Sequence, residues 1–374
     1  NETISDGGYF TKYNSDLSTA PKCWISESQR YKHQYQTIVE GLSHSCNYFF
    51  YTLGDRLGET RLYQYAANFG FTSKTGIDLP GEVRSVVGCQ TSLYDPDKAM
   101  DEASQDTSMP IIVFNSIKKH LRNQGASRNI TYDDERLNRC VKRLMDMAVN
   151  TNQADWVQSM RPILMEELNM TREMVHLQVV IGDTYNYLND IKWGGSQTIQ
   201  VAIGQSITTV SPAAVARYVA ALGNGGKVYN LIVDSITSPE GDIVSQRTPS
   251  LMHDFGEDSP NTAEYLSYIL KGMEGVVDES GTAERYFRNW QYQKDICAKT
   301  GTAEVTTLDL ENNAWFVMLA PKENPEIAVA VFIPSGLSGG MAGVAAREFV
   351  GWYMDQKTLR SVDVVFPSGN TLAP

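Results

Sequence analysis

The stretch ICAKTGTAEVTT, residues 296–307, decides the fold expected for this chain. Two further β-prone runs follow it at 314–320 and 327–332, joined by polar turns. Adjacent strands that are joined by short turns pair antiparallel. Residues 344–354 then predict a closing helix, so the final third of the chain predicts an antiparallel sheet followed by a helix.

The motif Lys299-Thr300-Gly301-Thr302 lies inside the first of these strands. It offers an ammonium group, two hydroxyls and, at the glycine, room for another backbone to approach. Such a strand can bind an extended peptide. A solvated strand lysine gives the same pattern, however, and Lys74-Thr75-Gly76 repeats the tripeptide in a segment that predicts a turn.

A short polar elbow, Ser45-Cys46-Asn47, interrupts the apolar helical pattern of residues 36–71. A hydroxyl and an amide can project together from such an elbow. Because Ser and Asn also commonly cap helices, the elbow by itself predicts either an ordinary cap or part of a site.

The composition excludes several classes of function. With 44 acidic and 32 basic residues, the formal charge of −12 argues against nucleic acid or anionic lipid as a partner. The longest apolar stretches, such as 327–334, are too short to span a bilayer. The length of 374 residues predicts two or three domains, and the start at Asn1 without a leader predicts a fragment.

Residues 94–191 are dense in methionine and charged residues and poor in proline. Their apolar positions repeat at helical spacing, as in Leu137, Cys140, Val141, Leu144, Met145 and Ala148, with Leu164, Leu168 and Val175 suggesting another helix. We therefore divide the chain into 1–93 with the elbow, a helical Met-rich insertion at 94–191, and 192–374 with the Lys-Thr-Gly strand.

Together, and in this order, the elbow and the strand motif match two of the motifs of penicillin-binding proteins and serine β-lactamases. The chain resembles the transpeptidase domain of a class B penicillin-binding protein over nearly all of its length outside the insertion. The segments that carry the resemblance are 45–50 (SCNYFF), 69–71 (FGF), 75–82 (TGIDLPGE), 203–205 (IGQ), 281–283 (GTA), 299–304 (KTGTAE) and 314–316 (AWF).

This resemblance implies an α+β fold of the serine β-lactamase and D,D-peptidase type. A central antiparallel five-stranded sheet is covered by helices, and an all-α lobe carries the elbow. The implied activity is that of a peptidoglycan D,D-transpeptidase, the target of β-lactam antibiotics. A serine attacks the D-Ala-D-Ala carbonyl of one stem peptide, and the acyl group passes to the amine of a second stem peptide.

The resemblance also assigns roles to residues of this chain. Ser45 would relay protons near the leaving amine, and Asn47 would hydrogen-bond the nucleophile's lysine and the substrate amide. Lys299 would hold the positive potential of the site. Thr300-Gly301-Thr302 would bind the substrate, with both hydroxyls on its terminal carboxylate and the Thr302 N–H in the oxyanion hole.

The family's nucleophile, the serine of Ser-x-x-Lys, does not precede Ser45 in this chain. The literal match Ser116-Ile117-Lys118-Lys119 follows the elbow and lies inside the insertion, which is the wrong order. We therefore expect the nucleophile upstream of Asn1. The resemblance also implies an N-terminal transmembrane helix there, which anchors the protein at the extracytoplasmic face of the bacterial membrane.

Two other functions stay open. A non-catalytic β-lactam sensor or scaffolding pseudo-enzyme would keep the groove without the nucleophile, and a D,D-carboxypeptidase would use water as the acceptor. The partners implied are peptidoglycan stem peptides, β-lactams and other cell-wall synthesis proteins such as a glycosyltransferase.

A second group of residues is independent of the first. Cys23, His33, His44 and Cys46 fall within 24 residues, and Asp16 lies shortly before them. Two thiolates and an imidazole suit tetrahedral zinc, and some clostridial class B enzymes resemble this in carrying a zinc near the active site. We predict structural zinc on Cys23, His33 and Cys46, with Asp16 as the fourth ligand and His44 as its competitor. The alternative is buried apolar cysteines beside surface histidines.

Overall fold

The computed structural model describes residues 2–99, 108–232, 235–278, 280–305 and 310–360. The chain divides into two compact units, unit 1 (Asn1–Val87 and Ile199–Pro374) and unit 2 (Gly88–Thr198). Among the described residues, every helix is too short or too polar to cross a bilayer.

Unit 1 is built on an antiparallel sheet with the strand order β5 (Cys297–Ala303), β6 (Asn313–Ala320) and β7 (Ile327–Ile333). The three β-prone runs of the final third are confirmed as these strands. The register is regular and pairs Lys299 with Val317 and Val317 with Ala330.

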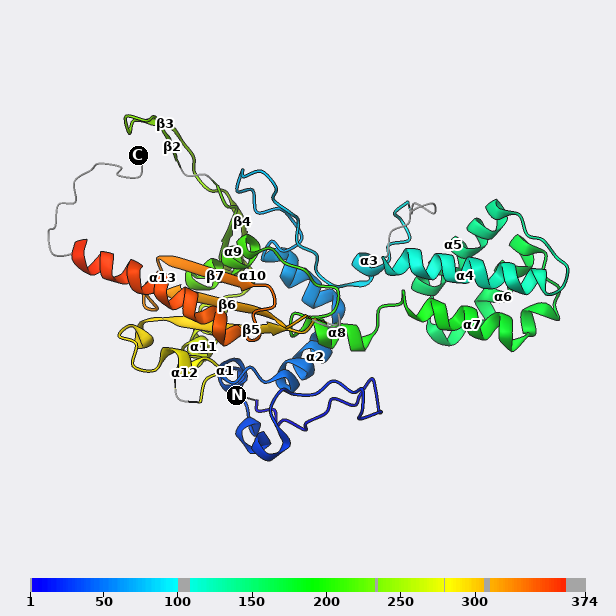
Figure 1. Ribbon diagram of the computed structural model, residues 1–374, viewed down its shortest axis with the longest axis horizontal. Helices are drawn as coiled ribbons and strands as arrows, with labels where there is room; N and C mark the ends of the chain where they lie inside the picture. Colours follow the sequence, from blue (N-terminus) through cyan, green and yellow to red (C-terminus); the bar gives the residue numbers. More distant parts are fainter. Residues whose placement is uncertain (1, 100–107, 233–234, 279, 306–309, 361–374) are drawn as a thin grey trace. The chain divides into compact units, whose positions relative to one another are not determined.

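Helices cover both faces of this sheet, because successive strand residues point to opposite sides. Phe316 and Met318 pack against α13 (Gly339–Arg360), which Figure 1 shows lying along the sheet. Cys297 and Leu319 point the other way and pack against α9 (Pro212–Gly223) and α11 (Thr262–Gly275). The α+β class is therefore confirmed.

The five strands expected in the central sheet are not found in the described residues, where the sheet has three. The other strands are short and pair locally, β1 (Lys227–Tyr229) with β4 (Leu251–Asp254) and β2 (Ser235–Thr237) with β3 (Ile243–Gln246). With three or four residues each, they form small ribbons apart from the main sheet.

The helical pattern of 36–71 is confirmed as α1 (Ile38–Ser43) and α2 (Asn47–Asn68), which are separated by the elbow. The short helix α1 packs against α11, and α11 contacts β5. A Cβ on Gly272 would lie 2.7 Å from the Leu42 Cβ, so glycine lets the two helices approach. This packing brings the elbow toward the β5 strand.

The remaining helices of this unit and its border are η1 (Glu27–His33), α8 (Gly195–Val201), α10 (Phe255–Asp258), α12 (Glu284–Phe287) and η4 (Gln293–Asp295).

Unit 2 is helical and has its own core. Its helices are α3 (Gln90–Leu93), α4 (Met109–Ala126), α5 (Asp134–Asn150), η2 (Gln153–Asp155), α6 (Trp156–Leu168), η3 (Met174–His176) and α7 (Gln178–Asn189). All six apolar positions predicted for one face of α5 are buried, and so are Leu164, Leu168 and Val175. Asp133 caps the start of α5 by accepting the Arg136 N–H at 3.1 Å.

The chain leaves unit 1 and returns to it at neighbouring points. Val86 donates its N–H to the Thr209 carbonyl at 2.7 Å, and Thr209 donates back at 2.9 Å. The predicted segment 94–191 lies inside unit 2, between these two residues.

Replacing 94–191 with a short Gly/Ser linker should therefore leave unit 1 folded, because the Val86–Thr209 pair already holds the two chain ends together. Circular dichroism and thermal unfolding of the shortened protein measure this. Val86→Pro in the shortened protein removes one of the two N–H donors and should lower its melting temperature. Loss of cooperative unfolding in the shortened protein itself would contradict the prediction.

Candidate functional site

The elbow between α1 and α2 has a defined backbone structure. Ser45 has φ 52°, in the left-handed region. The Ser45 N–H donates to the Leu42 carbonyl at 3.2 Å, and the Cys46 N–H donates to the Gly41 carbonyl at 3.0 Å. These two bonds form a Schellman motif, which ends α1 and turns the chain sharply. The turn presents the Ser45 side chain at the start of α2.

Lys299 reaches this turn from β5. Its Nζ donates to the Ser45 Oγ at 2.8 Å and to the Thr300 carbonyl at 2.8 Å, although Ser45 and Lys299 are 254 residues apart in sequence. Burial disfavours the charged ammonium and lowers the pKa of Lys299 to about 8. An amine with this pKa can exchange protons with a neighbouring hydroxyl near neutral pH.

The three residues after Lys299 line the same strand. The Thr300 Oγ1 lies 2.8 Å from the Thr282 Oγ1, and the Thr302 Oγ1 accepts the Gly339 N–H at 3.0 Å. A Cβ on Gly339 would lie 2.5 Å from the Gly301 carbonyl oxygen, so the start of α13 closely approaches this strand. Thr302 is exposed and Thr300 half-buried. Thr282 was not predicted as a site residue.

Asn47 is the first residue of α2, two positions after Ser45. The Tyr51 hydroxyl, one turn further along the helix, donates to the Lys22 carbonyl at 3.5 Å. Burial raises the pKa of Tyr51 to about 12, so this hydroxyl stays neutral and can donate a proton. Asn47 thus lies at the helix start, directly after the elbow.

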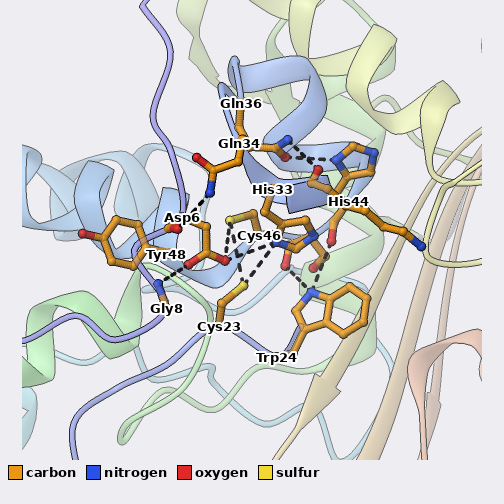
Figure 2. A network of polar contacts seen from close by, with 12 residues as sticks. Asp6, Gly8, Cys23, Trp24, His33, Gln34, Gln36, His44, Cys46 and Tyr48 are labelled. Carbon is orange, nitrogen blue, oxygen red and sulfur yellow. Dashed lines mark hydrogen bonds and ion pairs between the residues drawn. The ribbon is translucent and has the colours of Figure 1, made fainter. Parts of the chain in front are cut away.

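Cys46, between Ser45 and Asn47, belongs to a second group behind the elbow. Asp6, Cys23, His33 and Cys46 are all buried, and their ligand atoms lie within 4.8 Å of one another, so the group could hold a metal (Figure 2). The Cys23 Sγ lies 3.4 Å from the His33 Nδ1 and 3.9 Å from the Cys46 Sγ. The Asp6 Oδ2 lies 3.4 Å from the His33 Nδ1 and 3.9 Å from the Cys46 Sγ.

Asp16 was wrongly predicted as the carboxylate of this group. It is exposed, and its Oδ1 accepts the N–H and the hydroxyl of Ser18 at 2.9 and 2.8 Å. Asp6 takes the place because the N-terminal segment pairs with the end of η1 and the residues after it. The Asp6 N–H donates to the His33 carbonyl at 3.0 Å, and Ile4 pairs with Gln36. A pairing between distant segments leaves no signal in residue spacing, so sequence reasoning missed Asp6.

His44, the predicted competitor, does not join the group. Its ring stacks on that of His33 with centroids 5.6 Å apart, and its Nδ1 lies 3.0 Å from the Gln36 Oε1. His44 therefore supports the ring of His33 from one side.

The charges of the four side chains are coupled. The hydrogen bond from Cys46 lowers the pKa of Cys23 to about 5 and correspondingly raises that of Cys46. Burial lowers the pKa of His33, but its contacts with Asp6 and Cys23 outweigh burial and raise it to about 9. Without a cation, the group thus carries thiolate, carboxylate and imidazolium together. A divalent cation would favour loss of the remaining thiol and imidazolium protons.

Comparison with protein families gives a match to the model described as the penicillin binding protein transpeptidase domain, over residues 1–100 and 177–352. Among curated proteins, the chain is 30% identical over 186 residues to the peptidoglycan D,D-transpeptidase MrdA of Haemophilus influenzae, covering 44% of this chain and 27% of that protein. It is 48% identical over 75 residues to stage V sporulation protein D of Bacillus subtilis, covering 20% of this chain and 11% of that protein. The chain thus spans about a quarter or less of these relatives.

Solved structures show the same fold. A Helicobacter pylori penicillin-binding protein, PBP2, in complex with MreC matches with a TM-score of 0.56 and 16% identity, covering 95% of this chain and 45% of that chain. Pseudomonas aeruginosa PBP2 in complex with WCK 5153 matches with a TM-score of 0.55 and 20% identity, covering 94% and 56%.

The lowered pKa of Lys299 predicts a pH-dependent stability. Because the folded state disfavours the ammonium, Lys299 destabilises unit 1 below about pH 8. This cost disappears as the pH rises toward the pKa that the lysine has in the unfolded chain. Between pH 7.5 and 10, wild type should therefore gain about 2 kcal/mol relative to Lys299→Met. Urea unfolding at both pH values measures the difference, with the exposed Lys74→Met as the control. The same pH dependence in Lys299→Met and wild type would contradict it.

Proposed function

Because this chain belongs to the family of penicillin-binding protein transpeptidase domains, we propose that it is the Ser-x-Asn and Lys-Thr-Gly portion of a peptidoglycan D,D-transpeptidase of class B. Its substrates would be peptidoglycan stem peptides, and β-lactams would acylate the same site. The chain spans only part of its relatives, so this activity concerns the whole protein to which it belongs.

The contact of the Lys299 Nζ with the Ser45 Oγ carries the proposal. In the proposed reaction, the nucleophilic serine loses its proton to the lysine of its own motif and bonds to the D-Ala carbonyl carbon. The C–N bond of the terminal D-Ala breaks, and Ser45 gives its proton to the leaving amine while Lys299 returns one to Ser45. A lysine with a pKa of about 8 suits this exchange. The amine of a second stem peptide then attacks the acyl-enzyme carbonyl, the ester C–O bond breaks, and the proton lost by the amine restores the serine hydroxyl. The proton held by the motif lysine returns to Lys299 through Ser45.

We propose that Asn47 positions the substrate amide and the nucleophile's lysine, and that Thr300 and Thr302 bind the terminal carboxylate. Gly301, which lies between them and has no side chain, leaves room for the substrate backbone to approach the strand. Their common strand and the close approach of Gly339 support these roles. The Thr302 N–H would serve the oxyanion hole together with that of the nucleophile.

The nucleophile itself is proposed to lie upstream of Asn1, in a Ser-x-x-Lys motif. The internal match Ser116-Ile117-Lys118-Lys119 lies on α4 of unit 2, whereas Ser45 and Lys299 belong to unit 1. Lys118 also forms an ion pair with Asp134 at 3.5 Å, as a surface helix residue commonly does.

We further propose that Asp6, Cys23, His33 and Cys46 hold a structural zinc. Two sulfurs, one imidazole and one carboxylate are a donor set that zinc binds tetrahedrally, and all four side chains are buried. The Gly8 N–H donates to the other Asp6 oxygen at 2.7 Å, which orients the carboxylate as an outer partner of a metal ligand does. When bound, zinc would brace Cys46 and hence the elbow, and the acyl transfer itself would need no cofactor.

Other aspects of the proposal follow from the family. The protein would work at the extracytoplasmic face of the bacterial membrane, anchored by an N-terminal transmembrane helix outside these residues, with cell-wall synthesis proteins such as a glycosyltransferase. A five-stranded central sheet stays part of the proposal, and among the described residues β7 has a strand partner on one side only. Residues 94–191 would be an insertion, since the family model leaves 101–176 unmatched.

A D,D-carboxypeptidase, which passes the acyl group to water, and a non-catalytic β-lactam sensor or scaffold remain the alternatives. Identification of the product separates the transpeptidase from the carboxypeptidase, because only a transpeptidase joins two stem peptides. Absence of a nucleophile upstream of Asn1 would favour the sensor or scaffold.

Lys299→Ala should slow acylation by a β-lactam at least about a hundredfold in protein that includes the upstream segment, because a preorganised charge is lost from the site. Mass spectrometry of protein sampled during drug treatment measures the rate. Lys74→Ala changes the duplicate tripeptide and should react like wild type. An unchanged rate in Lys299→Ala would contradict the role of Lys299.

Protein purified without added metal should contain about one zinc per chain by elemental analysis. Asp6→Asn and Cys46→Ser should lower this zinc content. They should also lower the melting temperature by at least about 5 °C, because metal binding contributes to folding. Asp16→Asn is the matched control and should keep its zinc. Zinc well below one per chain in wild type, or full zinc in Cys46→Ser, would contradict the metal site. The cysteines would then be ordinary buried core residues.

A further inference from the structure

Trp24 connects the four-ligand group with the elbow. It follows Cys23 directly, and its Nε1–H donates to the Ser45 carbonyl at 2.9 Å and to the His44 carbonyl at 3.2 Å (Figure 2). These carbonyls belong to the two residues at which α1 ends and the chain turns toward Asn47.

The turn needs such support. A non-glycine residue in the left-handed region is strained by about 1 kcal/mol, and Ser45 adopts this conformation with φ 52°. The N–H groups of Ser45 and Cys46 are bonded inside the turn. The indole bonds the carbonyl side, so Ser45 is held from both sides of its backbone.

Packing around the indole leads to the ligand group. Its ring meets the His33 ring edge to face, with centroids 5.7 Å apart and planes at 70°, and His33 stacks in turn on His44. Trp24 is nevertheless 58% exposed, so little of its surface is buried by this packing. The hydrogen bonds to the turn are therefore its most specific contacts.

We propose that Trp24 is a positioning residue that fixes the Ser45 hydroxyl at Lys299 through its hydrogen bonds to the backbone of the turn. The inference rests on the proposed function of Ser45. Trp24 touches no reacting atom and acts only through the turn. Its neighbour Cys23 anchors it at one end, and the Ser45 carbonyl receives its N–H at the other.

Trp24→Phe tests this, because phenylalanine keeps an aromatic ring and removes the N–H donor. Trp352→Phe on α13 is the matched control, since Trp352 is 59% exposed. In protein that includes the upstream segment, the acylation rate constant should fall about tenfold in Trp24→Phe, the effect expected for one hydrogen bond. The dissociation constant of the non-covalent β-lactam complex and the zinc content should not change.

A double-mutant cycle distinguishes positioning from a general structural effect. If Trp24 acts through the Ser45 hydroxyl, Trp24→Phe should have little further effect on acylation in a Ser45→Ala background. A tenfold loss in both backgrounds would overturn the inference.

Hydrogen exchange on this chain itself gives a readout independent of acylation. The Ser45 and Cys46 amides should exchange about tenfold faster in Trp24→Phe and remain unchanged in Trp352→Phe. Unchanged exchange would overturn the positioning role whether or not the protein is acylated. The two proposals can fail separately. If exchange is faster in Trp24→Phe but the complete wild-type protein is not acylated, the coupling of Trp24 to the turn is upheld and the proposed function is rejected.

Discussion

The contact between the Lys299 Nζ and the Ser45 Oγ is the constraint that the packing of unit 1 has to satisfy. It joins the first and last thirds of the chain, so the α1–α11 packing, the β5 register and the glycine contacts must all agree for it to form. Each of these features is ordinary by itself. Their agreement at one 2.8 Å contact places a buried amine beside a hydroxyl.

Local patterns in the sequence predicted much of this arrangement. The elbow, the three strands of the final third and the buried face of α5 follow from periodicities that reflect direct burial of one side of an element. The pairing of Ser45 with Lys299 came from resemblance, because no spacing rule connects residues so far apart.

Two of the misses, Asp6 and Trp24, share a physical origin, because their contacts leave no pattern in the sequence. Asp6 reaches His33 through pairing of two segments, whereas Asp16 is nearer in sequence and satisfies its own turn. Trp24 was missed because an exposed indole that bonds backbone carbonyls leaves no pattern among side chains. The prediction of five strands in the central sheet differs from the structure for another reason. The described residues supply three strands to this sheet, and the remaining short strands pair with one another.

Under the proposed function, the conformation of Ser45 also sets a stability–activity trade-off. The first position after the helix cap in a Schellman turn, which Ser45 occupies, is the place where glycine, which has no Cβ, is the least strained residue. A serine there lowers the stability of the fold by about 1 kcal/mol relative to an unstrained residue. Selection for stability alone would therefore drive this position toward glycine, and only a requirement for the hydroxyl opposes that drift.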